Sequence, residues 1–309
     1  MGIAALVPYK LNAQQGCCRL IGLLGPNPKV FAALNLERDL QALGWEPERD
    51  YRLLVRWSNG ANQELPRLAA ELAAHPVELL VAAGDQAVIA AQRATRAIPI
   101  VGICDDMVGS KLVASMARPG GNTTGISILA SELNVKRLEL LHEIVPRASR
   151  IGVLADPTTI ATGPQLESAA RALDIALVTA RAAEGEEVGR ALGELAGAEV
   201  GAVNVLASPI LDEQRGSIIE QLNRARLPAI FQWPESAEAG GLAGYGPRLG
   251  GVIRAAVQIA DKILRGVPPA DIPVQQPTAF ELAINAHTAK ALGLTVPQSL
   301  LARANEVIE

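Results

Sequence analysis

Acidic, hydroxyl and aromatic residues follow the short apolar runs of this sequence, where they could bind the polar and flat parts of a small molecule. Asp85 follows one such run, and Trp233 ends another. A site for a zwitterionic ligand needs donors for a carboxylate, an anionic acceptor for an ammonium and an apolar or aromatic wall. The sequence supplies all three. The candidate ligand-binding residues are Pro26, Asn27, Gly84, Asp85, Gln86, Asp105, Asp106, Asp156, Ser208, Pro209, Trp233, Glu235 and Tyr245.

The candidates near the middle of the chain have structural alternatives. Residues 84–87 lie where a strand passes into a helix, so their backbone N–H groups and the helix dipole would favour a carboxylate. Asp85 could equally cap that helix, and Ser208 could cap another. Asp105 and Asp106 end the next strand, and either is an ammonium partner or a turn residue.

The later candidates also allow two interpretations. Asp156 before Pro157 and Glu235 after Pro234 are ligand contacts or plain turn residues. Because aromatic residues make up only 3% of the chain, Trp233 and Tyr245 in loop positions are candidates for stacking on a ligand, with core packing as the alternative.

Catalytic and metal-binding patterns do not emerge from the sequence. It has no His-Glu-x-x-His, no Cys-x-x-Cys and no Walker-type glycine loop. Cys104 at a strand end resembles a buried nucleophile, but none of the three histidines follows a neighbouring strand to activate it. We therefore expect a protein that is not an enzyme and that holds no metal and no cofactor.

Composition limits the partners. The chain has 309 residues, of which 49% are hydrophobic, and a formal net charge of −4 at pH 7. That length suits two medium-sized domains. Without a basic stripe, nucleic acid is not an expected partner. Three cysteines, two of them adjacent, do not form a disulfide framework.

Apolar runs alternate with amphipathic stretches from Arg19 onward, which is typical of βαβ units. We expect strands near 19–24, 51–57, 78–82 and 99–103, with helices near 29–43, 61–74 and 85–95. After a Pro-Gly-Gly-Asn break at 119–122, the alternation restarts with strands near 150–155, 175–179, 201–206 and 228–231 and helices near 132–145, 163–173, 186–196 and 212–226. A glycine-rich break at 240–247, a helix near 248–265 and a strand-like run at 272–284 follow.

This pattern predicts an α/β protein with two Rossmann-like parallel-sheet lobes joined by three crossings that act as a hinge. We expect lobe 1 to hold residues 19–122 and 245–271, and lobe 2 to hold 123–244 and 272–309. Open α/β sheets bind ligands at the carboxyl ends of their strands, so the site is expected between the lobes. The expected hinge residues are Asn122, Thr124, Gly125, Gly244 and Pro273.

The first 18 residues are expected to be a leader remnant or a disordered N-terminus. Residues 1–8 are apolar but short, no basic segment precedes them, and Lys10 interrupts the run, so an intact signal peptide is not predicted. Residues 15–18 lack the aliphatic residue of a lipoprotein cleavage box, so Cys17 and Cys18 are expected to be ordinary thiols.

Several motifs resemble one family. The chain is similar to ABC transporter substrate-binding proteins of the tryptophan/tyrosine type, which have the type I periplasmic-binding fold. The resemblance covers nearly all of the chain from residue 19 onward, and residues 12–15 resemble the end of the family's signal peptide. The matching segments are Asp105 together with Arg118 to Gly125, Lys136 to Leu141 with Val145-Pro146, Glu238 to Gly241 with Tyr245 to Pro247, and Asn285 to Gly293 with Pro297 and Ser299 to Ala304.

The resemblance implies a role in transport. A protein of this family would capture a small ligand, an amino acid of aromatic or branched apolar type, in the cleft by hinge closure. It would act as a monomer in the periplasm and deliver the ligand to an ABC permease with its ATPase. The alternative is a ligand-sensing module for a receptor or a two-component system, since the same fold serves that use.

Overall fold

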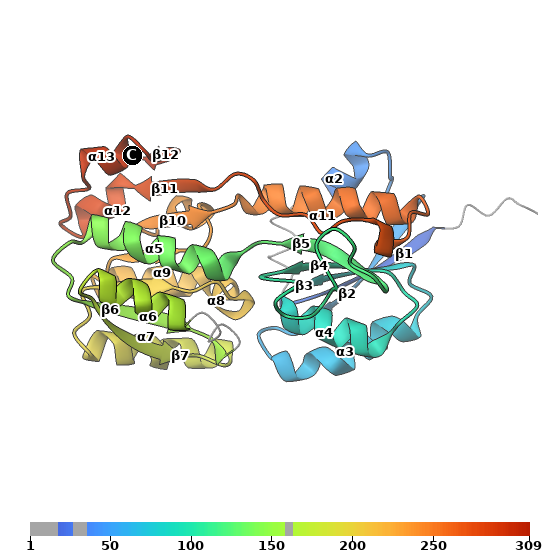
Figure 1. The fold of residues 1–309 in the computed structure, drawn as a ribbon, viewed down its shortest axis with the longest axis horizontal. Coiled ribbons are helices and arrows are strands. Elements are labelled where there is room, and N and C mark those ends of the chain that lie inside the picture. Colours follow the sequence, from blue (N-terminus) through green and yellow to red (C-terminus); the bar gives the residue numbers. More distant parts are fainter. Residues whose placement is uncertain (1–17, 27–35, 158–162) are drawn as a thin grey trace, which may run out of the picture.

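Two α/β lobes lie side by side along the long axis of the molecule (Figure 1). The computed structural model describes residues 18–26, 36–157 and 163–309. Asn27, the predicted leader up to residue 17 and the first part of the helix expected at 29–43 lie outside the described residues.

The first lobe is built on a five-stranded parallel sheet with strand order β2-β1-β3-β4-β5. Its strands are β1 (Arg19–Gly25), β2 (Tyr51–Trp57), β3 (Leu79–Ala83), β4 (Ile100–Cys104) and β5 (Thr123–Ser127). The accompanying helices are α2 (Leu36–Ala42), α3 (Leu65–Ala74), α4 (Asp85–Ala94) and α11 (Leu249–Leu264), with 3-10 turns η1 (Asn62–Glu64) and η4 (Pro269–Asp271).

The second lobe holds a seven-stranded sheet with order β12-β11-β10-β9-β8-β6-β7, in which only the β10–β11 pair is antiparallel among the described strands. The strands are β6 (Arg150–Ala155), β7 (Ala176–Arg181), β8 (Ala202–Val205), β9 (Ala229–Phe231), β10 (Ala243–Gly246), β11 (Glu281–Asn285) and β12 (Glu306–Ile308). The helical segments are α5 (Ala130–Ile144), α6 (Gly163–Ala172), η3 (Gly185–Glu187), α7 (Val188–Gly197), α8 (Pro209–Glu213), α9 (Arg215–Arg224), α10 (Glu235–Glu238), α12 (Ala286–Ala291) and α13 (Gln298–Leu301).

Each sheet has an apolar core on both faces, which explains why the strands are almost continuously hydrophobic. In the first lobe, α11 supplies Val252, Ile253 and Val257 to a cluster with β1 and β3, while α3 and α4 pack with the other face. In the second lobe, α5 and α6 share one cluster, and α7 and α9 share another. The core therefore consists of aliphatic layers that hold the strand ends in fixed positions.

The chain passes between the lobes three times, at residues 128–129, 247–248 and 276–280. The boundaries predicted after residues 122, 244 and 271 each lie a few residues before the corresponding observed crossing. The first two differences arise from the short strands β5 and β10. Their sequences contain glycine and were therefore not predicted to be strands. At the third, the Val274 N–H donates to the Met116 carbonyl and Gln275 pairs with Ile126, so the chain still belongs to the first lobe there.

The five predicted hinge residues lie inside the lobes rather than in the crossing segments. Asn122 precedes β5, where its amide donates to the Ile98 carbonyl at 2.7 Å, and Thr124 Oγ1 donates to the Ile272 carbonyl at 2.7 Å. Pro273 follows that contact on the first lobe.

The two hinge candidates that are glycines serve close backbone packing. A Cβ on Gly125 would lie 1.9 Å from the Gly102 carbonyl oxygen, and one on Gly244 would lie 2.1 Å from the Trp233 carbonyl oxygen. Neighbouring backbone therefore occupies the space of a side chain, which is the reason for glycine at both positions.

Candidate functional site

The carboxyl ends of the parallel strands in the two lobes face each other, and three close approaches join them at increasing distance from the crossings. Nearest the crossings, the Asp105 carboxylate acts electrostatically on Arg137 of α5. In the middle, a Cβ on Gly84 would lie 2.8 Å from Pro209 Cγ. At the far edges of the sheets, a Cβ on Gly60 would lie 3.6 Å from the Gly185 backbone nitrogen. The described structure is therefore a closed arrangement of the lobes.

The first lobe contributes a carboxylate at the start of α4. Asp85 Oδ1 accepts from the Asp105 N–H at 3.0 Å, and its Oδ2 accepts from Ser110 Oγ at 2.6 Å. Burial raises the pKa of Asp85, and the hydrogen bond from Ser110 opposes that rise. Asp85 thus holds the loop after β4 in place, and the alternative role, a side-chain cap of its own helix, is not formed.

The structure distinguishes the two adjacent acids. Asp106 is exposed, and its Oδ1 accepts from the N–H groups of Val108 and Gly109 in a local turn. Asp105 is partly buried, and its negative charge favours the protonated form of Arg137 on the other lobe. Asp105 is therefore the acid that the fold places at the interlobe face, and Asp106 is the turn residue.

Two other first-lobe candidates contribute less. Gln86 is exposed. Pro26 is buried at the end of β1, and its carbonyl oxygen accepts from the Asn59 N–H at 2.7 Å. Pro26 therefore positions the loop that carries Gly60.

On the second lobe, the residues after β8 begin α8. Ser208 is 4% exposed, and its hydroxyl oxygen accepts from the N–H groups of Ile210 and Leu211. The capping interpretation of Ser208 is therefore correct, although the same side chain also lines a small hollow described below. Pro209 follows and makes the close approach to Gly84.

Trp233 follows β9 and joins the two lobes. Its side chain is 7% exposed and belongs to the hydrophobic cluster of the first lobe, although the residue itself is on the second. Its indole Nε1 is buried and has no hydrogen-bond partner within the described residues. A buried N–H donor without a partner costs free energy, so a ligand group or a water is expected there.

The acids of the second lobe are also buried. Asp156 is 1% exposed after β6. Glu235 Oε1 accepts from the Leu249 N–H at 2.9 Å, while its Oε2 is buried without a hydrogen-bond partner within the described residues. Burial raises the pKa of Glu235, which is the expected response of a carboxylate removed from water.

Tyr245 differs from its prediction. It lies in β10 opposite Leu282, and its side chain packs with the core cluster of the second lobe. Its carbonyl oxygen accepts from Arg137 Nη1 at 3.0 Å. Its observed link to the interlobe face is thus the backbone carbonyl, because the strand register directs its ring into the lobe.

Sequence reasoning missed four polar residues at this face. Arg137 is fully buried, its Nη2 donates to Asn134, and burial lowers its pKa to about 9. Asp212 and Arg215 form an ion pair of 3.4 Å between α8 and α9, and Ser236 is 1% exposed in α10. The three-residue spacing of Asp212 and Arg215 was the available signal for that pair.

A small hollow of about 20 Å³ lies among these second-lobe residues. Such a volume is enough for about one water molecule or one compact polar group. Its lining contains the polar residues Ser208, Asp212, Arg215, Gln232 and Ser236 together with Trp233, Phe231 and three aliphatic residues.

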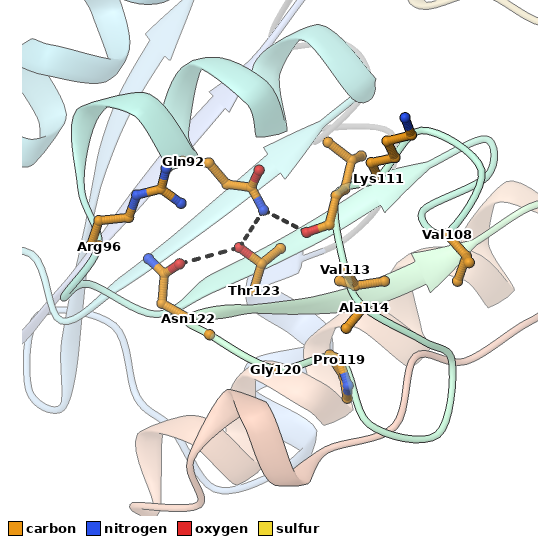
Figure 2. A pocket seen from close by; sticks show the side chains of 12 residues that line it. Gln92, Arg96, Val108, Lys111, Val113, Ala114, Pro119, Gly120, Asn122 and Thr123 are labelled. Carbon is orange, nitrogen blue, oxygen red and sulfur yellow. Dashed lines mark hydrogen bonds between the residues drawn. The ribbon is translucent and has the colours of Figure 1, made fainter.

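A larger hollow of about 510 Å³ lies elsewhere, on the first lobe between α4 and the loop that precedes β5. Figure 2 shows the Gln92 amide donating to Thr123 Oγ1, and the same amide donates to the Leu112 carbonyl. Its charged residues Arg96 and Lys111 are exposed. It borders Asn122 at the amino end of β5, away from the facing strand ends, so we do not assign the ligand to it.

Two features of the structure bear on alternative functions. Within residues 18–26, 36–157 and 163–309, no three His, Cys, Asp or Glu side chains are grouped as metal ligands. None of the helices in the same part of the chain has the length and apolar character needed to cross a membrane.

Known proteins resemble this chain in sequence and in structure. A tyrosine-binding protein of Clostridioides difficile (strain R20291) is 28% identical over 235 residues, which span 74% of this chain and 66% of that protein. The crystal structure of a conserved domain protein from Vibrio cholerae O1 biovar El Tor strain N16961 has a TM-score of 0.85 and 26% identity, covering 95% of this chain and 100% of the other. An ABC domain from Streptococcus pneumoniae in complex with L-Trp has a TM-score of 0.83 and 22% identity, covering 94% and 100%.

The two parallel-sheet lobes predicted from the sequence are confirmed, and they match the type I periplasmic-binding fold. The model of one family matches residues 35–308, which include nearly all the described elements of both lobes. Its members act by binding a substrate rather than by converting it. The chain belongs to the ABC transporter substrate binding protein family.

Proposed function

We propose that this protein captures an amino acid with an aromatic or branched apolar side chain between its lobes and delivers it to an ABC permease. The observation that carries the proposal is the set of buried polar atoms without hydrogen-bond partners on the second-lobe face: Arg215 Nη1, Trp233 Nε1, Glu235 Oε2 and Ser236 Oγ, within the described residues. Proteins rarely leave such atoms unpaired unless a ligand or water completes them.

The mixture of donors and acceptors supports a zwitterion. Arg215 and Trp233 can donate to a carboxylate, and the carboxylates of Asp212 and Glu235 can accept from an ammonium. Trp233 also provides an aromatic surface for an apolar side chain. The names of the Clostridioides and Streptococcus proteins, which refer to tyrosine and L-Trp, favour an aromatic amino acid.

Closure is proposed to occur at the crossing segments. In the first, Leu129 has a φ of +53°, which is strained for a large side chain, and its N–H donates to the Asp105 carbonyl. The other two crossings are linked by a hydrogen bond, because Arg248 of the second crossing donates to Glu281, which directly follows the third. A ligand that contacts both lobes would shift the population toward the closed form, which a permease could then recognise.

The protein is proposed to act as a monomer. Its proposed location is the periplasm, outside the cytoplasm, because a binding protein meets both its ligand and an importer there. The family membership supports this location.

A ligand screen tests the proposal. Thermal unfolding is measured with each of the twenty amino acids, and with purines and short peptides as comparison compounds. We expect L-tyrosine, L-tryptophan or a related apolar amino acid to raise the Tm, because a ligand that binds only the folded protein stabilises it. If no amino acid raises the Tm, the proposed ligand class is wrong.

A further inference from the structure

We infer that the second lobe holds the charged head group of the ligand, with Arg215 binding its carboxylate and Asp212 its ammonium. This inference rests on the proposed function. It assigns the charged end of the ligand to the small hollow on the second lobe. Neither residue was a candidate from the sequence.

Asp212 and Arg215 attract each other without forming a close hydrogen bond. Arg215 Nη1 lies 3.4 Å from Asp212 Oδ1, close enough for charge attraction, yet Nη1 is buried and has no hydrogen-bond partner in the described part of the chain. A well-formed bond between a guanidinium and a carboxylate is shorter, about 2.8 Å. The pair is therefore arranged side by side with hydrogen-bonding capacity left for a third group.

Other polar groups surround Asp212 and Arg215. Both residues line the hollow of about 20 Å³, together with Trp233, whose Nε1 is a second unpartnered donor, and Ser236, whose hydroxyl is also unpartnered in the described residues. Trp233 and Ser236 are 7% and 1% exposed. Two donors and a carboxylate beside a space for one compact polar group match the two ends of a zwitterion.

Charge balance around the pair favours a cation. Burial raises the pKa of Asp212, Arg215 opposes that rise, and Glu235 raises the pKa further electrostatically. Glu235 in turn lies near Arg248, which already pairs with Glu238, Glu281 and Glu306. Carboxylates therefore outnumber guanidinium groups here, and an ammonium would offset the excess negative charge. The hollow has no room for a ligand's side chain, so the side chain must extend away from it, toward the first-lobe residues that pack on Trp233.

Selectivity of the wild-type protein provides the first test. Binding of L-tyrosine and L-tryptophan is measured by calorimetry beside their N-acetyl derivatives and their amides. We expect each derivative to bind at least about tenfold more weakly, because it leaves Asp212 or Arg215 buried without its counter-charge. If the screen identifies a different amino acid, its own N-acetyl and amide derivatives are used.

Variants assign the roles. Arg215→Met should weaken binding of the free amino acid at least about tenfold, to the affinity of its amide. Asp212→Asn should remove the preference for the free amino acid over its N-acetyl derivative. Arg224→Met is the matched control, since Arg224 lies on the same helix α9 in an exposed ion pair with Glu220. Circular dichroism and Tm identify any variant that does not fold, in which case the wild-type comparison decides.

The outcomes separate two failures. If the wild type binds an amino acid and both its derivatives equally, or if Arg215→Met still prefers the acid to the amide, the head-group assignment is overturned and the proposed function stands. If no amino acid binds at all, the proposed function itself fails.

Discussion

Gly84 and Pro209 approach each other so closely that a Cβ on the glycine would lie 2.8 Å from the Cγ of the proline. Gly84 precedes α4 on the first lobe, and Pro209 begins α8 on the second. Cβ atoms essentially never come this close to another heavy atom. The glycine therefore permits the closed contact, besides having a φ of +94°.

Replacing Gly84 should consequently impair closure. Gly84→Ala is expected to weaken ligand binding by about tenfold or more, since the new methyl group meets Pro209 only when the lobes close. Calorimetric titration measures the loss.

Gly44→Ala is the control for that experiment. Gly44 has a similar φ of +89° but no heavy atom within 4 Å of a built Cβ. Both variants should lose about 1 kcal/mol of stability from backbone strain, and only Gly84→Ala should lose affinity. Pro209→Ala combined with Gly84→Ala should restore part of the affinity. Equal binding by all these variants would show that the contact does not form on closure.

Trp233 should report closure by its fluorescence. The chain has three tryptophans, and Trp233 is the one buried between residues of both lobes. Opening would expose its ring to water, so a saturating ligand should shift the emission to shorter wavelength. Trp45→Phe should keep this shift, because Trp45 lies away from the strand ends, bonded to Asp261 of α11. Trp233→Phe should abolish most of it, and a full shift in that variant would contradict the assignment.

Arg248 should stabilise the crossings. Its guanidinium pairs with Glu281 at 2.6 Å and with Glu238 and Glu306. These hydrogen bonds raise its pKa although desolvation opposes the rise. Arg248→Gln should lower the free energy of unfolding by about 2 kcal/mol in urea denaturation. Arg254→Gln, at an exposed position of α11, the helix that follows Arg248, should change it by less than about 0.5 kcal/mol. Equal effects would exclude a special role for the Arg248 network.

The stability of the ligand-free protein should depend on pH through Asp85. Burial raises the folded-state pKa of this group above its ordinary value of 3.8. The folded protein then binds the proton more tightly than the unfolded chain, so the stability contributed by the neutral acid is complete below about pH 3.8 and is lost as the pH rises through the folded pKa. Asp85→Asn should make the urea midpoint less sensitive to pH in this range.

Asp50 should show the opposite sign. The Arg49 side chain and the Glu46 N–H lower the pKa of Asp50 to about 2, so its contribution is present above pH 3.8 and lost as the pH falls through about 2. Asp50→Asn should therefore reduce the acid sensitivity of the midpoint in that range. A steeper pH dependence in Asp85→Asn, or an unchanged one in both variants, would contradict these assignments.

The strands with strong apolar patterns could be predicted from the sequence, and those rich in glycine could not. β1 and β6 lie within one residue of their expected bounds, because aliphatic runs buried on both faces leave an unambiguous signal. β10 has the sequence Ala-Gly-Tyr-Gly, which resembles a turn. Its glycines are needed where carbonyl groups of residues 232 and 233 approach, and only the folded structure reveals that requirement.

Residues that directly follow strands could be placed at the interlobe face from the sequence, and residues within helices could not. Carboxyl ends of strands located Asp85, Asp105 and Trp233 at the interlobe face, as a topological rule would. Asp212 and Arg215 were not predicted as site residues, because an acid and a base three residues apart on a helix are usually a surface ion pair. Their partial burial depends on how α8 and α9 pack within the second lobe, which a local pattern cannot encode.

The three crossings also determine the order in which the chain can fold. The first lobe needs β1 to β5 from the first 127 residues, but α11, which covers one face of its sheet, begins only at Leu249. During synthesis, the apolar face formed by Ile21, Leu79 and Val101 must wait for this helix while the intervening second lobe is made. Native contacts across so many residues slow folding, and neither lobe exists as one continuous stretch that could be cut out and studied alone.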